Sequence, residues 1–369
     1  MKIAYLLGSL NRGGTETLLL DVFRSAAEAP FPFMGIHRKG GAYRGDFYAT
    51  SSEFVQCRPV RHNLIAYLIR LRKVLQSRQI TIVHAQQYID ALYAKLATVG
   101  TGIKVVETFH GFDFGSSRLQ KMLIQLSIRQ SDAVCFVSHT QREYYRQHYA
   151  FGKADKTHVV YNGIDFLKLD NTADPSPALP TKIDPASRGM KLAMVGNFVR
   201  GRAQSSLCQF LLRLAQEQVP FDFYFVGKRD DNEPWRYDDC VRFCEAHNLQ
   251  DHVHFLGSRN DVPQILHRLD AFVYATDHDT FGIAVVEAMA VGVPVLVNDH
   301  EVMKEVTHNG EWATLYRTGD TEDLWQHFST MAQDPESAKR KAEANAQVVR
   351  QQYSIAHHLQ QLYDVYKTL

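Results

Sequence analysis

The stretch Asp279-Thr-Phe-Gly-Ile-Ala-Val-Val-Glu287-Ala-Met-Ala-Val-Gly-Val-Pro-Val-Leu296 says most about the fold of this chain. Its apolar periodicity predicts a helix over Ile283–Val291, followed after a Gly-x-Pro segment by a buried strand over Val293–Val297. Glu287 falls inside this mostly apolar helix, where an ionised carboxylate needs a partner or an opening to a cleft. Asp279 precedes the helix, where its carboxylate can cap the helix or bind ligand hydroxyls. The pair therefore predicts a ligand site where this helix begins.

The same alternation of short apolar runs and amphipathic helices fills two blocks of the chain. The first block has predicted strands at Ile3–Leu7, Phe33–Ile36, Ile80–His84, Lys104–Thr108, Ala133–Val137 and Thr157–Tyr161, and predicted helices at Thr15–Ala27, Leu64–Gln79, Ala91–Val99, Leu119–Arg129 and Thr140–His148. The second adds strands at Lys191–Val195, Asp222–Val226, Val253–Leu256 and Ala271–Ala275, helices at Ala203–Gln218 and Tyr237–His247, and closing helices at Thr321–Met331, Glu336–Gln351 and Ile355–Lys367. Strands separated by helices of this length predict parallel βαβ units, with ligands at the carboxyl ends of the strands.

Residues 166–189 interrupt this alternation. They carry Pro175, Pro177, Pro180 and Pro185 among Asn, Asp, Thr and Ser residues, a composition typical of a loop or linker. The chain therefore predicts an α/β protein of two doubly wound halves, residues 1–165 and 190–351. Two such halves joined by a linker are expected to form a deep cleft, which is the default place for a ligand site.

Length and composition limit the class of protein. The 369 residues are 45% hydrophobic and 22% charged, as expected for two domains with buried cores and not for a disordered, collagen-like or disulfide-stapled chain. Five scattered cysteines indicate a reducing compartment rather than a disulfide framework. We find no signal peptide and no apolar run of about 18 residues, so a cytoplasmic protein is expected.

The charge is divided unevenly between the two halves. Residues 1–165 contain 21 basic and 12 acidic side chains, whereas the rest of the chain contains 20 and 28. The basic first half is expected to attract phosphates or an anionic membrane surface. It lacks the concentrated Lys/Arg patch that would indicate nucleic-acid binding, so no nucleic-acid partner is expected.

The segment Gly8-Ser-Leu-Asn-Arg-Gly-Gly-Thr15 has the glycine spacing of a P-loop, but Gly14 stands where the phosphate-binding lysine should be. It also lacks the Gly-x-Gly-x-x-Gly order of a dinucleotide fold. Gly13 and Gly14 come just before a predicted helix, whose N-terminal amides can face an anion. The alternative is a tight turn that needs glycine for backbone reasons alone.

Two further motifs follow predicted strands. His110, in Thr108-Phe-His-Gly111, is placed at a strand end, where it can be a general base, a partner of sugar hydroxyls or an ordinary surface histidine. In the loop from Gly196 to Arg202, Arg200 and Arg202 flank a glycine before a helix, which suits a diphosphate. The alternative for this loop is a solvated basic turn.

In the order and spacing of its motifs the chain resembles the retaining, nucleotide-sugar-dependent glycosyltransferases of family 4, the glycosyltransferase group 1 enzymes with the GT-B fold. The resemblance covers nearly the whole length. It is carried by Gly13-Gly-Thr-Glu16, Thr108-Phe-His110-Gly, Asn162-Gly-Ile-Asp165, the Gly196–Arg202 loop, Val226-Gly227, Phe255-Leu-Gly257 and the block from Asp279 to Pro294. Each short motif is weak alone, and their combination is specific.

The resemblance implies two Rossmann-like domains that face a central cleft. Residues 1–165 would bind the acceptor, residues 190–351 would bind the donor, and a C-terminal helix at about 352–369 would cross back to the first domain. The implied activity is that of a hexosyltransferase that moves a sugar from a UDP- or GDP-sugar to an acceptor hydroxyl with retention. The resemblance implies neither a cofactor nor a metal.

The resemblance also assigns site residues. Gly13 and Gly14 would approach the donor diphosphate, and His110 would contact the transferred sugar. Glu287 would hold the ribose hydroxyls, and Asp279 with the backbone of Phe281, Gly282 and Ile283 would meet the sugar and phosphates. Gly257, Ser258 and Arg259 would border the nucleobase. The implied catalytic residues are His110, Asp279 and Arg202.

Three positions depart from the family pattern. Asp279 replaces the usual glutamate and is shorter by one methylene. Arg202 stands at the position of the diphosphate-binding lysine, which changes a point charge to a planar fork. Asn197 replaces an arginine, for which the charge of Arg200 can compensate. These departures predict an altered position of the donor phosphates.

The acceptor is expected to be a sugar or a lipid-linked glycan in the assembly of bacterial surface polysaccharide or glycolipid. The predicted helix Leu64–Gln79 combines apolar residues with Arg61, His62, Arg70, Arg72, Lys73 and Arg78. Such a helix can lie on an anionic membrane surface, or it is an ordinary sheet-covering helix with a solvated basic face. Two alternative functions stay open, a nucleotide-sugar epimerase of the same fold and a nucleotide-sugar binding protein without turnover.

Overall fold

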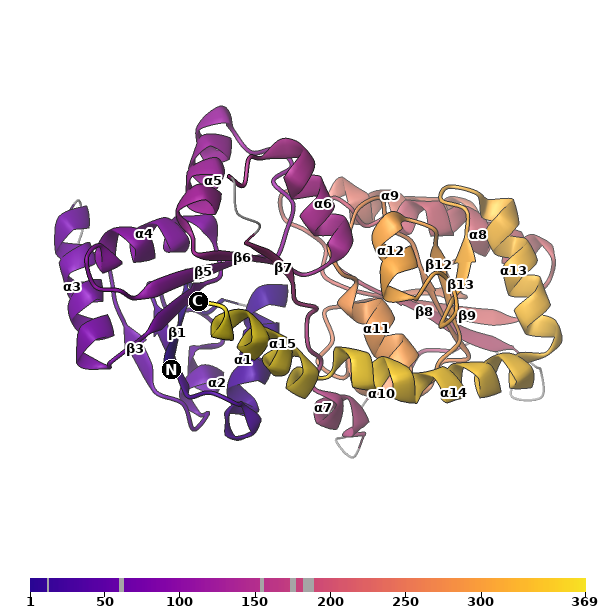
Figure 1. Cartoon of the computed structure of the whole chain (residues 1–369). Coiled ribbons are helices and arrows are strands. Elements are labelled where there is room, and N and C mark those ends of the chain that lie inside the picture. The colour runs from indigo at the N-terminus through magenta and orange to yellow at the C-terminus, as the bar shows by residue number, and fades with distance from the viewer. Residues whose placement is uncertain (12, 60–62, 153–155, 173–176, 182–188) are drawn as a thin grey trace. The chain divides into compact units, whose positions relative to one another are not determined.

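The computed structural model divides into two compact units, which we call unit 1 (Met1–Ile164 with Tyr353–Leu369) and unit 2 (Asp165–Gln352). It describes residues 1–369 except 12, 60–62, 153–155, 173–176 and 182–188 (Figure 1). Arg61 and His62 of the predicted basic helix, and Pro175 and Pro185 of the predicted linker, therefore lie outside the described residues.

Within the described residues, unit 1 is built on a seven-stranded parallel sheet in the order β3-β2-β1-β4-β5-β6-β7. The strands are β1 (Ile3–Leu7), β2 (Phe33–His37), β3 (Phe54–Gln56), β4 (Ile82–Ala85), β5 (Lys104–Phe109), β6 (Ala133–Phe136) and β7 (Thr157–Val159). The chain order of neighbouring strands reverses between β1 and β4. In open parallel sheets, ligands bind beyond the carboxyl ends of the strands at this kind of switch point.

Helices cover both faces of this sheet. They are α1 (Gly14–Arg24), the 3-10 turn η1 (Ala26–Glu28), α2 (Arg44–Tyr48), α3 (Leu64–Ser77), α4 (Tyr88–Thr98), α5 (Arg118–Gln130), α6 (His139–His148) and α15 (Ile355–Lys367). In β1, Ile3, Tyr5 and Leu7 pack with α1 and α15, whereas Ala4 and Leu6 pack with α3 and α4. Alternate side chains of one strand are therefore buried on opposite faces, as expected for a parallel sheet covered on both sides.

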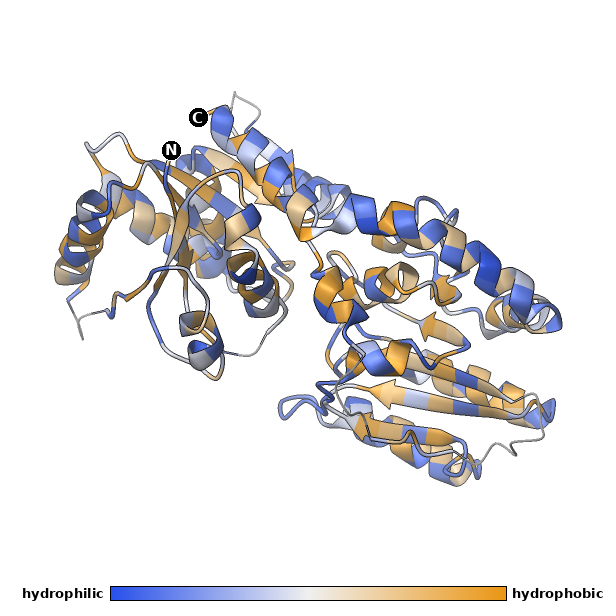
Figure 2. Ribbon diagram, turned by 90° about the horizontal axis from the view of Figure 1, so that it is seen from below, coloured by the Kyte–Doolittle hydropathy of each residue, from blue (hydrophilic) through white to orange (hydrophobic). Residues whose placement is uncertain are grey.

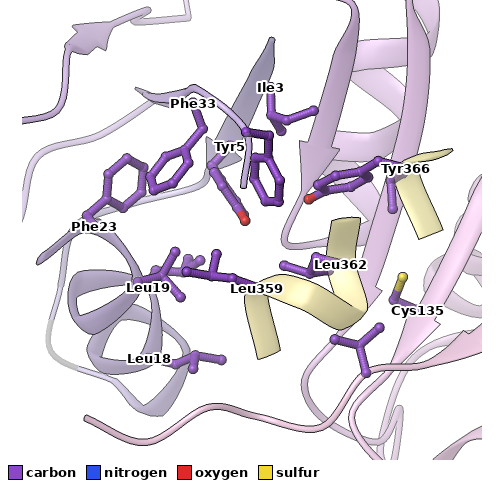
Figure 3. Packing of buried hydrophobic residues seen from close by; sticks show 14 of the residues in the cluster. Ile3, Tyr5, Leu18, Leu19, Phe23, Phe33, Cys135, Leu359, Leu362 and Tyr366 are labelled. Atoms are coloured by element: carbon purple, nitrogen blue, oxygen red, sulfur yellow. The ribbon is translucent and has the colours of Figure 1, made fainter. Parts of the chain in front are cut away.

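The C-terminal helix α15 is part of unit 1. Its residues Leu359, Leu362 and Tyr366 pack with Tyr5 and Phe33 of the sheet in one hydrophobic cluster (Figure 3). All five side chains are at least nine-tenths buried. The return of the C-terminal helix to the first domain is therefore observed, and it is held by apolar burial.

Unit 2 repeats the architecture with, in its described part, a six-stranded parallel sheet in the order β10-β9-β8-β11-β12-β13. The strands are β8 (Met190–Val195), β9 (Phe221–Val226), β10 (Val253–Gly257), β11 (Ala271–Tyr274), β12 (Val295–Asn298) and β13 (Thr314–Tyr316). The helices are α7 (Phe166–Asp170), α8 (Gln204–Gln216), α9 (Trp235–Ala246), α10 (Val262–Leu266), α11 (Ile283–Ala290), α12 (Glu301–Val306), α13 (Thr321–Gln333) and α14 (Pro335–Tyr353). Its switch point lies between β8 and β11.

The predicted fold class, two doubly wound α/β halves, is confirmed. Strands are mostly apolar and the helices carry one apolar and one polar face (Figure 2). The segment 166–189, expected as a loop, instead begins with helix α7. Asp165 caps this helix by accepting a hydrogen bond from the Lys168 amide (3.2 Å), and Asp170 pairs with Arg350 of α14 (2.5 Å). The prolines that suggested a loop all lie after this helix.

Candidate active site

The candidate donor site of unit 2 lies at the carboxyl ends of β8 and β11, which are neighbours in the sheet. Arg202 belongs to the loop after β8, and Asp279 belongs to the loop after β11. The two loops are joined by a bridge between Arg202 and Thr276. The Thr276 hydroxyl also donates to the Gly201 carbonyl (2.6 Å). The topology therefore brings together two predicted site residues that are far apart in the sequence.

Arg202 and Asp279 form a largely buried ion pair. The distance from Arg202 Nη1 to Asp279 Oδ2 is 2.7 Å, and the two side chains are 24% and 9% exposed. The guanidinium also lies over the ring of Tyr274, 5.6 Å from its centroid. Burial acts to lower the pKa of Arg202, but Tyr274 and Asp279 outweigh it and raise that pKa. A permanent cation is therefore held at this sheet edge.

Groups of the protein occupy the acceptor positions of the Asp279 carboxylate. Besides Arg202, Oδ2 accepts a hydrogen bond from the Tyr274 hydroxyl (3.0 Å). Oδ1 accepts from the backbone amides of Thr280 (2.8 Å) and Phe281 (3.4 Å). A carboxylate has about four acceptor positions. In this state Asp279 therefore anchors Arg202, the Tyr274 hydroxyl and the loop before α11 rather than presenting a free oxygen to a sugar.

Helix α11 begins at this loop. Its N-cap Gly282 has φ +85°, a left-handed conformation that favours glycine, and a Cβ there would meet Met303 Cε at 2.7 Å. Ile283, Ala284 and Glu287 are the only residues of the described helix that are not fully buried. Glu287 therefore lies on the single face of α11 that is not packed into the core, as its predicted ligand role requires.

The other predicted donor residues lie in loops at the same sheet edge. Asn197 Oδ1 accepts a hydrogen bond from the Lys228 amide (2.8 Å), which ties the loop after β8 to the loop after β9. Arg200 is exposed and has no ion-pair partner among the described residues. Arg259, after Gly257 and Ser258, is paired with Asp261 through two hydrogen bonds (2.7 and 2.5 Å). Arg200 is thus a cation of this edge that no described carboxylate neutralises.

Sequence analysis did not identify several residues that shape the site. Asn298, at the end of β12, donates to the Thr276 carbonyl and accepts from the Thr276 amide (2.8 and 2.9 Å). Burial lowers the pKa of His300, which precedes α12, and outweighs the opposite effect of the Asp279 carboxylate. Its Nδ1 is buried and has no hydrogen-bond partner in the described part of the chain. Both are polar residues at or just after the end of an apolar strand, and this pattern in the sequence could have identified them.

In unit 1, the predicted Gly13-Gly14 turn lies between β1 and the N-terminus of α1. Gly13 is the N-cap, with an extended backbone, and Gly14 is helical, so neither needs glycine to reach a left-handed conformation. A Cβ at Gly14 would meet no atom within 4 Å. Neither the backbone conformation nor the packing therefore requires a glycine at position 14. This favours the interpretation that a ligand approaches this helix terminus.

His110 follows β5 and is positioned by Gln86, which follows β4. Gln86 Nε2 donates to the His84 carbonyl (3.4 Å), which turns Oε1 of Gln86 toward His110 Nε2 (2.8 Å). Because an amide oxygen only accepts, His110 Nε2 carries the proton. Burial and the charge of His358 lower the pKa of His110 to about 3. A neutral imidazole with so low a pKa suits a partner of hydroxyl groups better than a general base.

Two more buried histidines surround His110. His84 bonds the hydroxyls of Tyr366 (2.5 Å) and Thr108 (2.6 Å), and burial lowers its pKa well below the ordinary value. His358 of α15 donates from Nδ1 to the Tyr161 carbonyl (2.6 Å), and burial lowers its pKa to about 4. These side chains border a cavity of about 10 Å³, close to the space of one water molecule. Helix α15 thus contributes His358 and Tyr366 to the surroundings of His110.

Two family models match the chain. The model described as "Glycosyltransferase Family 4" matches residues 12–166, and the model described as "Glycosyl transferases group 1" matches residues 179–348. The first match falls almost wholly in unit 1 and the second in unit 2. Among the described residues, no helix is long and apolar enough to cross a membrane.

Curated relatives are glycosyltransferases and synthases. The chain is 26% identical over 299 residues to the N-acetyl-alpha-D-glucosaminyl L-malate synthase of Bacillus anthracis, covering 78% of this chain and 75% of that protein. It is 32% identical over 149 residues to the N,N'-diacetylbacillosaminyl-diphospho-undecaprenol alpha-1,3-N-acetylgalactosaminyltransferase of Campylobacter jejuni, covering 39% and 37% of the two chains. Among solved structures, Anabaena HepE in complex with UDP has a TM-score of 0.82 at 18% identity, with all of both chains covered.

Proposed function

Because the chain belongs to glycosyltransferase family 4 and is a hexosyltransferase, we propose that it moves a sugar from a UDP- or GDP-sugar to an acceptor hydroxyl with retention. The observation that carries this proposal is the cation Arg202, fixed by Asp279 and Tyr274 at the switch point of unit 2. The bound UDP of the HepE structure is consistent with a uridine donor.

The chemical need in this reaction is to stabilise a leaving diphosphate. Arg202, with Arg200 beside it and the amides at the start of α11, supplies positive charge and N–H donors before the reaction begins. The bond from the sugar C1 to the phosphate oxygen breaks, and a bond from C1 to the acceptor oxygen forms on the same face. The acceptor proton passes to the leaving phosphate oxygen, so no nucleophile from the protein is required.

The remaining roles follow from position and chemistry. Glu287, on the unpacked face of α11, is proposed to accept hydrogen bonds from the ribose hydroxyls. Gly257, Ser258 and Arg259 are proposed to border the base. In unit 1, the Gly13-Gly14 turn and neutral His110 are proposed as contacts to the diphosphate and to a sugar hydroxyl. We propose that neither a metal nor a cofactor takes part.

We further propose that the acceptor is a sugar or lipid-linked glycan in the assembly of bacterial surface polysaccharide or glycolipid, and that the chain works at the cytoplasmic face of a membrane. The named acceptor of the Campylobacter relative, a diphospho-undecaprenol, supports this proposal. So does helix α3, which exposes Ile65 and Ile69 (72% and 51%) next to Arg70 and Lys73.

A thermal-shift screen tests the donor assignment. The chain is heated with uridine, guanosine and adenosine diphosphates and with their sugar conjugates. A ligand at 100 times its dissociation constant stabilises the fold by about 2.7 kcal/mol, which is easily measured. We expect one nucleotide family to raise the melting temperature of the wild type, with little effect on Arg202→Ala. The control Arg242→Ala, which removes an exposed cation of α9, should respond like the wild type.

Other outcomes contradict the proposal. The absence of a shift with every nucleotide would argue against a donor site in unit 2. Conversion of the donor into another sugar nucleotide without any acceptor would support the epimerase alternative. Binding of the donor without turnover in the presence of candidate acceptors would support the second alternative, a nucleotide-sugar binding protein without catalytic activity.

A further inference from the structure

Three exposed cations gather at the carboxyl edge of the unit 1 sheet, at the end formed by β1, β2 and β3. Lys39 follows β2 and Arg58 follows β3, each two residues after its strand, and Arg44 is the first residue of α2. All three side chains are exposed. Neighbouring parallel strands end at one edge of a sheet, so Lys39 and Arg58 lie on the same side of the molecule.

Buried His37, the last residue of β2, is hydrogen-bonded to each of the segments that carry the three cations. Its Nδ1 donates to the Lys39 carbonyl (3.0 Å), so its Nε2 accepts from the Tyr48 hydroxyl (3.0 Å). The Cys57 amide donates to the His37 carbonyl (2.9 Å), which holds the residue before Arg58 against the end of β2. Burial lowers the pKa of His37, the hydrogen bond to the Lys39 carbonyl raises it, and the charges of Arg44 and Arg58 lower it. The Arg44 guanidinium also lies over the Tyr48 ring, 4.8 Å from its centroid.

No carboxylate neutralises this cluster in the described structure. Between Lys39 and Arg58 the chain has two acidic residues, of which Glu53 pairs with Arg78 (2.5 Å) and Asp46 is exposed on α2. The neighbouring Arg38 is different, because it is paired with the fully buried Asp90 (2.5 Å). Lys39, Arg44 and Arg58 form no ion pair with any described residue.

The loop between β2 and α2, which carries Lys39 and leads to Arg44, is hydrogen-bonded to the glycine-rich loop after β1. The Lys39 amide donates to the Gly8 carbonyl (3.1 Å), and the Tyr43 amide donates to the Leu10 carbonyl (2.9 Å). Lys39 and the start of α2 therefore lie beside the loop that leads to Gly13 and Gly14. In an open parallel sheet this edge is where ligands bind.

We propose that Lys39, Arg44 and Arg58 form the recognition site for a dianionic group of the acceptor, a phosphate, diphosphate or dicarboxylate. This inference rests on the proposed transferase function and names the chemical class of its acceptor. Two guanidinium forks and an ammonium group suit such an anion, because each fork can hold two oxygens of one acidic group. The basic character of the first half of the chain would assist its approach.

The test uses the full chain with the donor site saturated by the nucleoside diphosphate that stabilises it, so that added anions cannot occupy that site. Binding of farnesyl diphosphate and of L-malate is measured by calorimetry. We compare the triple variant Lys39→Ala/Arg44→Ala/Arg58→Ala with the control Arg24→Ala/Lys121→Ala/Arg129→Ala, which removes the same charge from exposed positions of α1 and α5. The two anions separate a lipid-linked diphosphate from a small dicarboxylate acceptor.

We expect at least one anion to bind the wild type and the control, and to bind the triple variant at least ten-fold more weakly. An equal loss in both triple variants would mean that net charge alone attracts the anion, and would overturn the site. Failure of both anions to bind the wild type would overturn it too. Nucleotide binding by the triple variant separates the two proposals, because it survives if only the acceptor site is wrong.

Discussion

The ion pair between Arg202 and Asp279 changes how the first carboxylate of the Asp-x7-Glu motif is understood. The family resemblance implied that Asp279 meets the sugar and phosphates, and the sequence alone left capping of the helix or binding of ligand hydroxyls open. In the structure all its acceptor positions are taken, by Arg202, Tyr274 and two backbone amides. The short aspartate side chain thus serves as the counter-ion that keeps the Arg202 fork in place. Asp279 would then affect catalysis by positioning Arg202 on the diphosphate, and not by contacting the sugar.

A double-mutant cycle tests this interpretation. We expect Arg202→Ala to weaken binding of the nucleoside diphosphate by roughly 10- to 100-fold, because a hydrogen bond to a charged group contributes about 1.5–3 kcal/mol. Asp279→Ala should weaken binding in the wild type but have little effect in the Arg202→Ala background, because residues that act through one another are not additive. Calorimetry with the nucleoside diphosphate and with its sugar conjugate provides the binding free energies. A loss confined to the sugar conjugate, and equal in both backgrounds, would instead show direct contact with the sugar.

Packing divides the apolar and basic residues of helix α3 into those that are used within the fold and those that remain on its surface. Tyr67, Leu71 and Leu75 are buried against the sheet. Two basic residues of the predicted basic face have structural partners. Arg72 of α3 donates to the Val99 carbonyl (2.7 Å), and Arg78, the C-cap of α3, pairs with Glu53 (2.5 Å). The surface that remains for a membrane is therefore smaller than the predicted basic face. It consists of Leu64, Ile65 and Ile69 with Arg70 and Lys73.

We expect the double variant Ile65→Ser/Ile69→Ser to bind anionic lipid vesicles about ten-fold more weakly than the wild type, because two apolar side chains no longer enter the interface. Vesicle sedimentation measures the bound fraction. The matched control is Leu167→Ser on α7, which removes an apolar side chain that is 80% exposed in unit 2. Equal binding by all three proteins, or equal binding to anionic and neutral vesicles, would contradict a membrane role for α3.

Across unit 1, buried titratable groups couple stability to pH in two opposite directions. Burial raises the pKa of Glu107 from 4.5 to about 8, even though the hydroxyls of Ser127 and Ser131 donate to its carboxylate. Burial lowers the pKa values of His84, His110 and His358 from 6.5. Between these pKa values, Glu107 is protonated in the folded state but ionised in the unfolded chain. The three histidines are neutral in the folded state at pH values at which they are protonated in the unfolded chain.

These shifts predict that the stability of unit 1 is greatest near pH 6.5. Below this pH His84, His110, His358 and His37 bind protons more readily in the unfolded chain, so stability falls as the pH falls toward 4. Above it only Glu107 matters, and stability falls by about 1 kcal/mol per pH unit up to about pH 8. The variant Glu107→Gln should lose this upper decline and keep the lower one.

Urea unfolding at several pH values measures the effect. All three tryptophans, Trp235, Trp312 and Trp325, belong to unit 2. Their fluorescence therefore follows unit 2, whereas far-UV circular dichroism follows both units. We expect the pH dependence in the dichroism but not in the tryptophan transition. An upper decline that persists in Glu107→Gln would show that another group is responsible.

The local pattern of the sequence was sufficient for most helices and strands. The strand Ile3–Leu7 and the helix Ile355–Lys367 have the predicted bounds, because a run buried on both faces and an amphipathic helix each leave a periodic signal in neighbouring residues. Strands β3 and β13 and helix α7 were missed, since three to five residues are too few to show a period. The order of motifs along the chain was likewise enough to indicate the family.

The sequence by itself thus determined the two α/β halves, their strand ends and the loops that hold the candidate site. Only the tertiary structure decided what the charged and polar groups do there. It pairs Arg202 with Asp279, leaves Lys39, Arg44 and Arg58 without a counter-ion in the described chain, and keeps His110 neutral. The physical reason is that hydrophobic periodicity is encoded between neighbouring residues, whereas desolvation and ion pairing depend on residues far apart in the chain.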